Sequence, residues 1–300
     1  MKIGFVGLGN MGMQMALNLS KSNKIKLIGF DINQRANKKF EQLGGKTSNS
    51  LTEIFENDLI ISCLPGPKQL KMISIGKNKL IEKLNKNKLW IDCSTNSLSC
   101  FNLFKKKMGN KINFFIDAPI SGGNIKAKSG ELSIFIGGTK KLYKKTKFIF
   151  NILGKNLYYL GNSGAGYVAK ISQVSLCYLN YLSLSESLML GIKSGIKPKV
   201  MLDIIDKSAS GGYTSSRYGP DMINGSYDKS FSIGLSLKDL KLAKEIINLK
   251  KLNLPIMELT KNIYTKAKKK YGDESNHLKV IKLLETRNKL TLSKKKRRAK

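Results

Sequence analysis

The first residues of the chain combine three glycines in a spacing that can bind the phosphates of a dinucleotide. Gly7, Gly9 and Gly12 form a G-x-G-x-x-G loop between an apolar run over residues 2–6 and a helical pattern over residues 11–19. The first glycine of such a loop permits a tight turn, the second lets the backbone approach a pyrophosphate, and the third allows close packing of helix on strand. The positive end of the helix dipole favours the phosphates. The contacts we expect come from Gly7, Leu8, Gly9, Asn10, Met11 and Gly12.

An acidic residue follows at a distance that suits the same ligand. Asp31 comes directly after a second apolar run, residues 26–30. This is close to the spacing of roughly 20 residues at which such folds place a carboxylate on the ribose 2′-hydroxyl. Because a carboxylate accepts a hydrogen bond from that hydroxyl and repels a 2′-phosphate, Asp31 predicts NAD as the cofactor. Arg35 is near in sequence and could offset the repulsion, so NADP stays an alternative.

A lysine stands near the beginning of a long helical pattern that is almost free of charge. Residues 167–192 predict one helix, in which Lys170 and Glu186 are the charged residues. A buried ammonium ion is costly unless it faces a polar cavity, and burial moves the pKa of an amine toward neutrality, where it can exchange protons. Lys170 is therefore a candidate general acid/base, with a lysine that extends to solvent as the alternative. Ser, Gln and Asn residues interrupt the pattern, which favours a buried central helix over a membrane span.

The elements that would position these residues belong to two domains. Apolar runs alternate with helical stretches up to about residue 160, which is typical of a parallel sheet flanked by helices. The runs cover residues 2–6, 26–30, 59–63, 89–92, 114–117 and 132–136. Beyond a glycine-rich linker at residues 161–166 only helical patterns remain. The sequence predicts an α/β Rossmann-type N-terminal domain (1–162), an all-α C-terminal domain (163–290) and a basic disordered tail (291–300).

Composition excludes several classes of function. The net charge of +34 comes mainly from lysines that are spread along the chain without interleaved aromatic residues, so we expect no specific nucleic-acid partner. Four cysteines without C-x-x-C spacing and a single histidine, His277, argue for a reducing compartment and against a zinc site. The apolar start of the chain lacks the features of a secretory signal. We expect a cytoplasmic protein with no membrane association.

Four motifs, in order along the chain, resemble those of the 3-hydroxyisobutyrate dehydrogenase family. They are residues 4–19 with the glycine loop, residues 117–138 beginning Asp-Ala-Pro-Ile-Ser-Gly-Gly, residues 161–170 with spaced glycines and Lys170, and residues 231–243 with Lys-Asp-Leu at 238–240. The resemblance covers nearly the whole chain. It implies an NAD(P)-dependent oxidoreductase that transfers hydride between the nicotinamide and a small 3-hydroxy acid or its semialdehyde. It also implies a homodimer or homotetramer.

The resemblance assigns roles to individual positions. Lys170 would be the general acid/base on the substrate oxygen. The substrate carboxylate would be held by Ser121 and the backbone N–H groups of Gly122 and Gly123, and Gln173 would help to place the substrate. The cofactor would also contact Leu64, Pro65, Thr95 and Lys238.

Two positions depart from the family pattern. Val174 stands where a second amide side chain is usual, and Lys126 stands where glycine is usual. They keep open an alternative function, a catalytically impaired dinucleotide-binding protein with a regulatory or scaffold role.

Two other dehydrogenase classes fit less well. The pair Tyr143 and Lys147 has the Y-x-x-x-K spacing of short-chain dehydrogenases, but that spacing is common in so lysine-rich a chain and their glycine loop has another form. The 6-phosphogluconate dehydrogenases carry His-Asn after their lysine and have a much longer helical domain.

Overall fold

The computed structural model describes residues 1–76, 79–227 and 231–293, and the chain forms two compact units. Unit 1 is Met1–Lys170 and unit 2 is Ile171–Lys300. Each unit has its own hydrophobic core.

Among the described residues, unit 1 contains eight strands, eight α-helices and one 3-10 helix before the long helix α9 begins. In chain order they are β1 (Lys2–Val6), α1 (Asn10–Ser20), β2 (Lys26–Phe30), α2 (Gln34–Gln42), α3 (Leu51–Ile54), β3 (Leu59–Ser62), α4 (Pro67–Ser74), α5 (Leu80–Lys83), β4 (Leu89–Asp92), α6 (Leu98–Met108), the 3-10 helix η1 (Gly109–Phe114), β5 (Phe115–Asp117), β6 (Ile120–Ser121), α7 (Gly123–Ser129), β7 (Leu132–Ile136), α8 (Lys140–Leu153) and β8 (Gly154–Tyr159).

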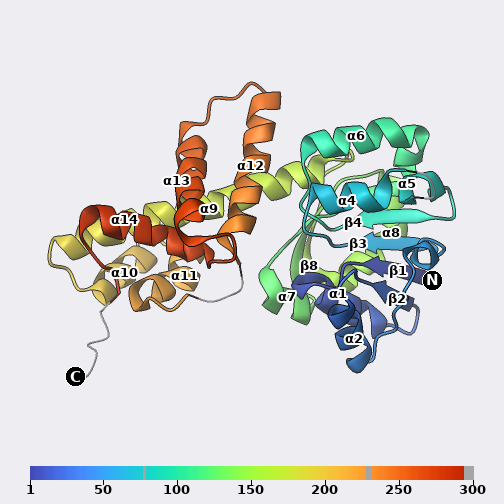
Figure 1. Cartoon of the computed structure of the whole chain (residues 1–300), viewed down its shortest axis with the longest axis horizontal. Helices are drawn as coiled ribbons and strands as arrows, with labels where there is room; N and C mark the ends of the chain where they lie inside the picture. The colour runs from blue at the N-terminus through green and yellow to red at the C-terminus, as the bar shows by residue number, and fades with distance from the viewer. Residues whose placement is uncertain (77–78, 228–230, 294–300) are drawn as a thin grey trace. The chain divides into compact units, whose positions relative to one another are not determined.

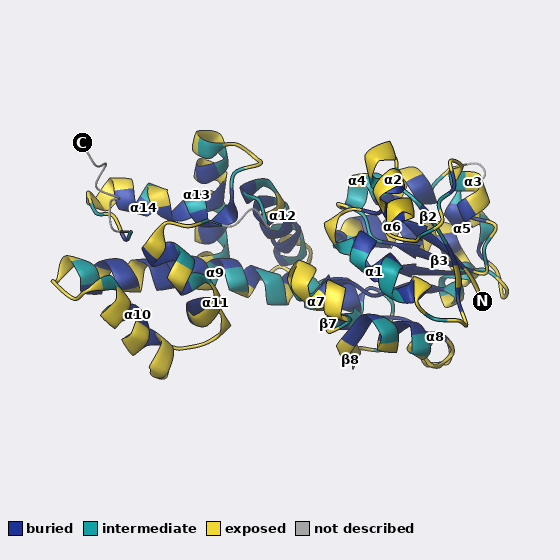
Figure 2. Cartoon of the chain, turned by 90° about the horizontal axis from the view of Figure 1, so that it is seen from below, coloured by how far each residue is buried: buried dark blue, intermediate teal, exposed yellow. Residues whose placement is uncertain are grey.

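Five of these strands form a parallel sheet in the order β2-β1-β3-β4-β5 (Figure 1). Alternate side chains point to opposite faces. Ile3, Phe5 and Ile61 belong to a core with α1 and α8, whereas Ile60 and Trp90 belong to a core with α4, α5 and α6. Burial on both faces explains why the strands are continuous apolar runs, and Figure 2 shows the sheet as buried beneath helices with exposed outer faces. The predicted Rossmann-type sheet is confirmed.

Three further strands form a second, mixed sheet in the order β6-β7-β8. The run predicted at residues 132–136 is β7, which pairs with this second sheet and not with the parallel one. β6 and β8 are not predicted from the sequence. β6 has two residues within a predicted loop, and β8 reads Gly-Lys-Asn-Leu-Tyr-Tyr with mostly accessible side chains, so neither gives an apolar run.

The regular elements of unit 2 are all helices in the part of the chain that the structure describes. The elements are α9 (Ala165–Lys193), which begins in unit 1, α10 (Pro198–Lys207), α11 (Tyr213–Asn224), α12 (Ile233–Leu249), α13 (Pro255–Tyr271), the 3-10 helix η2 (His277–Val280) and α14 (Ile281–Asn288).

The core of unit 2 is rich in aromatic residues. Tyr178 and Tyr181 of α9 pack with Tyr264 of α13 and with His277, which is buried against Tyr181. Among the described residues, no helix combines the length and the apolarity that a membrane crossing needs. The chain remains packed as far as Leu292, which is fully buried, and residues 294–300 of the predicted tail lie outside the described part.

Candidate active site

The predicted ligand-binding loops leave the parallel sheet along a single edge. Strand register places Phe30, Val6, Ser62, Asp92 and Asp117 in one row at the carboxyl ends of β2, β1, β3, β4 and β5. β1 pairs with β2 on one side and with β3 on the other, so the direction in which strands are added to the sheet reverses at β1. Ligands of open α/β sheets bind at such a switch point. The glycine loop, Asp31, Leu64 and Thr95 follow this row within three residues. The structure therefore brings these predicted residues to one edge of unit 1.

The three glycines of the loop meet different surroundings. Gly7 has φ +100°, and a Cβ there would lie 2.3 Å from the carbonyl oxygen of Cys63. A Cβ on Gly12 would lie 1.9 Å from the oxygen of Gly7. A Cβ on Gly9 would meet nothing within 4 Å. Gly7 and Gly12 thus maintain the fold, whereas Gly9 is exposed and borders open space.

This loop fits the pyrophosphate of NAD or NADP. Gly9 is the N-cap of α1, the cap makes no side-chain hydrogen bond, and the first turn carries no acidic residue. The N–H groups at the start of α1 thus face a position from which no carboxylate of that turn repels an anion. The open space at Gly9 lets a phosphate approach the backbone.

Asp31 follows β2 directly and is hydrogen-bonded to the glycine loop. Its Oδ2 accepts a hydrogen bond from the N–H of Leu8 at 2.7 Å, and its Oδ1 accepts one from the N–H of Asn33 at 2.8 Å. The backbone N–H of Asp31 donates to the side chain of Asn37 at 2.8 Å. The half-buried carboxylate is therefore fixed beside the loop, with lone pairs left for a further donor. Arg35 is exposed on α2.

A buried carboxyl group connects the loops that follow β3 and β4. Asp92 Oδ1 accepts hydrogen bonds from the hydroxyls of Ser62 at 2.7 Å and Ser94 at 2.6 Å, and Ser94 Oγ accepts the N–H of Leu64 at 2.9 Å. Burial raises the pKa of Asp92, and the hydroxyls of Ser94, Tyr167 and Ser62 act in the opposite direction. Pro65 is exposed and Thr95 half-buried beside this network.

The loop predicted to hold the substrate carboxylate follows β5. Gly122 and Gly123 have φ +138° and +68°, conformations that favour glycine. A Cβ on Gly122 would lie 2.8 Å from the Cβ of Lys126, so the unusual lysine at 126 packs over this glycine. Asn18 of α1 donates hydrogen bonds to the carbonyls of Ala127 and Lys128, at 2.9 and 3.2 Å. These bonds fasten the helix after the loop to the helix of the nucleotide motif. Ser121 is half-buried in β6.

The start of α9 is held by Asp117. Its Oδ1 accepts the N–H of Gly164 at 2.6 Å and its Oδ2 accepts the N–H of Tyr167 at 3.2 Å. Burial raises the pKa of Asp117 to about 7, and backbone N–H groups, with Gly164 first, offset part of that rise. Lys170 is half-buried in the next turn of the same helix.

Asp117 belongs to a sequence motif that assigns it no role of its own, and Asp92 lies outside all four motifs. The signal was present, because two neighbouring buried strands both end in Asp. Since parallel strands end at the same edge of a sheet, the two carboxyl groups had to be close.

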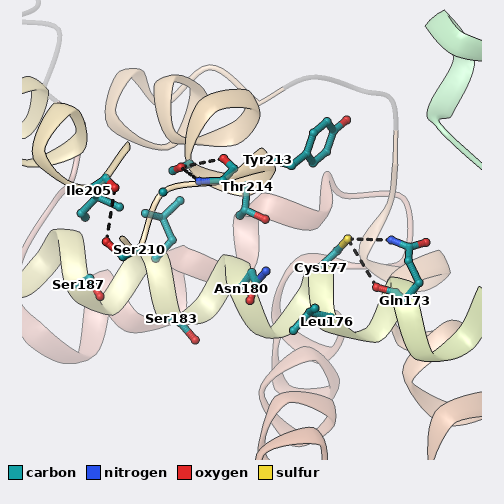
Figure 3. A pocket seen from close by; sticks show the side chains of 14 residues that line it. Gln173, Leu176, Cys177, Asn180, Ser183, Ser187, Ile205, Ser210, Tyr213 and Thr214 are labelled. Carbon is teal, nitrogen blue, oxygen red and sulfur yellow. Dashed lines mark hydrogen bonds between the residues drawn. The ribbon is translucent and has the colours of Figure 1, made fainter. Parts of the chain in front are cut away.

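Gln173 and Val174 lie in the part of α9 that belongs to unit 2. Gln173 Nε2 donates to Cys177 Sγ at 3.3 Å, and both residues line a cavity of about 450 Å³ between α9 and the start of α11 (Figure 3). Val174 packs against the aromatic core of unit 2. The half-buried valine thus adds apolar contact to this core at position 174.

Lys238 lies on α12, also in unit 2. Its Nζ is 3.1 Å from Oδ1 of the buried Asp239, whose Oδ2 accepts the hydroxyl of Tyr178 at 2.8 Å. Leu242 of α12 packs against Ile171 of α9. The helix that carries Lys238 is therefore attached to α9 at two points of unit 2.

Comparison with known proteins agrees with both units. A family model described as the NAD binding domain of 6-phosphogluconate dehydrogenase matches residues 2–161, and one described as NAD-binding of NADP-dependent 3-hydroxyisobutyrate dehydrogenase matches residues 164–284. Mitochondrial 3-hydroxyisobutyrate dehydrogenase of Mus musculus is 32% identical over 270 residues, which cover 87% of this chain and 80% of the mouse protein. The chain belongs to the 3-hydroxyisobutyrate dehydrogenase family.

Further relatives also match this chain over most of its length. The 2-hydroxy-3-oxopropionate reductase of Escherichia coli (strain K12) is 30% identical over 292 residues, which cover 95% of this chain and 97% of the reductase. The solved structure of Mycobacterium tuberculosis 3-hydroxyisobutyrate dehydrogenase with L-serine has the same fold, with a TM-score of 0.82, 23% identity and coverage of 94% and 98%. Membership of this family makes unit 1 an NAD(P)-binding domain.

The open space at Gly9 gives the first prediction. Gly9→Ala should leave the free energy of unfolding within about 0.5 kcal/mol of wild type and weaken NAD binding by at least about tenfold, because the methyl group occupies the path of the pyrophosphate. Gly12→Ala should destabilise the fold by roughly 1–3 kcal/mol. Urea unfolding and calorimetric titration with NAD measure the two effects. A Gly9→Ala protein that binds NAD like the wild type would remove this loop from the cofactor site.

The raised pKa of Asp117 gives the second prediction. With a folded pKa of about 7 against the usual 3.8, the native chain binds more protons than the unfolded chain between these values. The free energy of unfolding should therefore fall as pH rises through this interval, by at most about 1.4 kcal/mol per pH unit, and level off above it.

Asp117→Asn removes that titration. The amide places a donor against backbone N–H groups, so the variant should be less stable by roughly 1–3 kcal/mol at low pH. The difference from wild type should shrink between pH 5 and 7, measured by urea unfolding. A difference that stays constant with pH would show that Asp117 does not titrate there.

Proposed function

We propose that the chain is an NAD(P)-dependent dehydrogenase that interconverts a small 3-hydroxy acid and its semialdehyde. The observation that carries this proposal is the position of Lys170, on a helix whose first turn is bound by Asp117 at the cofactor edge of the sheet. The names of the relatives support the substrate class, because both act on small hydroxy or oxo acids.

Different residues of unit 1 would bind different parts of the cofactor and the substrate. The loop from Gly7 to Gly12 would bind the pyrophosphate, Asp31 the ribose, and the loops at Leu64 and Thr95 the nicotinamide half. The nicotinamide, when bound, accepts or supplies the hydride. Ser121, Gly122 and Gly123 would hold the substrate carboxylate.

Lys170 would exchange the proton at the reacting oxygen. In oxidation its amine takes the proton of the substrate hydroxyl, and in reduction its ammonium returns a proton to the carbonyl oxygen. Gln173, one turn later on α9, would hydrogen-bond the substrate, and Lys238 would contact the cofactor. We also infer from Asp31 that NAD is preferred to NADP, since the fixed carboxylate repels a 2′-phosphate.

The alternative of a catalytically impaired protein is less well supported. This alternative is based on two departures from the family pattern, Val174 and Lys126. Val174 packs into the core of unit 2, and Lys126 packs over Gly122 on a loop that keeps both of its positive-φ glycines. Neither departure changes Lys170 or Ser121.

We propose that the protein forms a homodimer or homotetramer through α9. Five exposed and uncharged residues lie three or four positions apart along this helix, namely Leu176, Asn180, Ser183, Ser187 and Leu190, with the exposed Glu186 and Lys193 beside this row. Leu190 is 73% exposed. In a chain with net charge +34, two copies can approach most easily where neither carries charge.

We further infer a cytoplasmic location, which the four cysteines support because all are thiols. We place the functional boundary between domains at residues 162–163, in the glycine-rich linker.

Lys170→Ala tests the proposed chemistry. Turnover should fall by at least about a hundredfold, while the dissociation constant for NAD stays within a few-fold of wild type. Lys170→Arg should fail equally, because a guanidinium keeps the charge but does not exchange its proton near neutral pH. Lys193→Ala, at the other end of the same helix, is the control and should keep full activity. Retention of most of kcat in Lys170→Ala would refute the proton-transfer role.

Leu190→Lys tests the proposed oligomer. Light scattering after size exclusion should give a dimer or tetramer for the wild type and a monomer for the variant, because the new ammonium would have to be buried against a second copy. Leu43→Lys places the same change at an exposed leucine of unit 1 and should leave the mass unchanged. A variant that keeps the wild-type mass would exclude this face of α9.

A further inference from the structure

A continuous hydrogen-bonded path runs from a cofactor loop to the beginning of α9. The N–H of Leu64 donates to Ser94 Oγ, the Ser94 hydroxyl donates to Asp92 Oδ1, and Tyr167 donates its hydroxyl to Asp92 Oδ2 at 2.5 Å. The Ser62 hydroxyl also donates to Asp92. Each of these groups belongs to unit 1, and Asp92 is fully buried.

Tyr167 is held by its backbone and by its side chain. Its backbone N–H donates to Asp117 and its hydroxyl donates to Asp92. The residue is 1% exposed, and its ring makes an edge contact with Phe101 at 5.8 Å between centroids. Lys170 follows three residues later, so the two side chains share a face of the helix. A rotation or shift of the first turn that would move Lys170 must therefore break the bond between Tyr167 and Asp92.

We propose that Tyr167 is a positioning residue, whose hydroxyl bond to Asp92 sets the placement of Lys170 and connects it to the cofactor loop at Leu64. The proposal rests on the proposed function for its kinetic consequence, but its structural consequence stands without turnover. Tyr167 does not contact the reacting atoms in this scheme. It acts by holding the helix turn that carries Lys170. Through Asp92 and Ser94, the position of this turn is connected to the loop at Leu64.

The path also predicts how loss of the Tyr167 hydroxyl would affect the start of α9. Asp92 takes its hydrogen bonds on Oδ1 from two serine hydroxyls and on Oδ2 from the tyrosine. Loss of the tyrosine hydroxyl removes the bond to Asp92 and leaves the two backbone N–H bonds to Asp117, from Gly164 and Tyr167, at the start of α9. The helix start should then open more often, and the cofactor loop should no longer affect it.

Tyr167→Phe is the direct test, with Tyr264→Phe as the matched control. Both phenols are fully buried, but the hydroxyl of Tyr264 makes no hydrogen bond with any described residue. Tyr167→Phe should lower kcat by about tenfold to a hundredfold, since a misplacement near 1 Å costs a factor of that order. The KM for NAD should stay within a few-fold, and the acidic limb of the pH profile of kcat should move. Tyr264→Phe should match the wild type in all three.

Amide hydrogen exchange separates this proposal from the proposed function. In the wild type, NAD should slow exchange in residues 64–66 and in residues 165–170. In Tyr167→Phe, exchange at 165–170 should be about tenfold faster and should no longer respond to NAD, while the response at 64–66 remains. Ser94→Ala, a second variant, should also break the response at 165–170 but keep its basal protection.

The outcomes are distinct. If the wild type shows no turnover on any hydroxy acid but the exchange pattern holds, the proposed function fails and the positioning role stands. If Tyr167→Phe has wild-type kcat, or wild-type exchange at residues 165–170, the positioning role is refuted.

Discussion

Two buried carboxyl groups at the ends of neighbouring strands constrain the rest of the site. Asp92 and Asp117 are paired in register and fully buried, so each must find hydrogen-bond donors within the protein. The donors are the serine hydroxyls at the cofactor loops and the N–H groups and tyrosine hydroxyl at the start of α9. Satisfying these two carboxyl groups brings the cofactor edge and the helix of Lys170 together within unit 1.

The glycine loop obeys a second constraint, the close approach of backbone to backbone. Gly7 and Gly12 leave no room for a Cβ, because the loop folds back on itself between β1 and α1. Gly9 is unconstrained by the protein and borders open space. The same short motif therefore contains two glycines that leave no room for a Cβ and one that has room for it. The carboxylate of Asp31 is attached to this loop because it accepts a hydrogen bond from the N–H of Leu8.

Most of the parallel sheet could be predicted because its strands are buried on both faces and read as short apolar runs. β1, β2 and β4 have the predicted bounds. β8 could not be predicted because its side chains are largely accessible and its residues polar. The grouping of the predicted cofactor residues at one edge of the sheet could be foreseen from the order of loops along the chain.

The network around Asp92 was harder to foresee, because it depends on register between strands far apart in sequence. The packing of Val174 depended likewise on the fold of unit 2. The roles of Lys170, Ser121 and Lys238 were inferred from motifs and remain proposals about chemistry.

The most direct measurement follows absorbance in the reduced-nicotinamide band while the protein is mixed with NAD or NADP and a panel of small 3-hydroxy acids and semialdehydes. Turnover of at least one member, faster with NAD than with NADP, is the predicted result. Binding of NAD without turnover of any member would contradict a dehydrogenase of this substrate class and would favour a dinucleotide-binding protein that has lost catalysis.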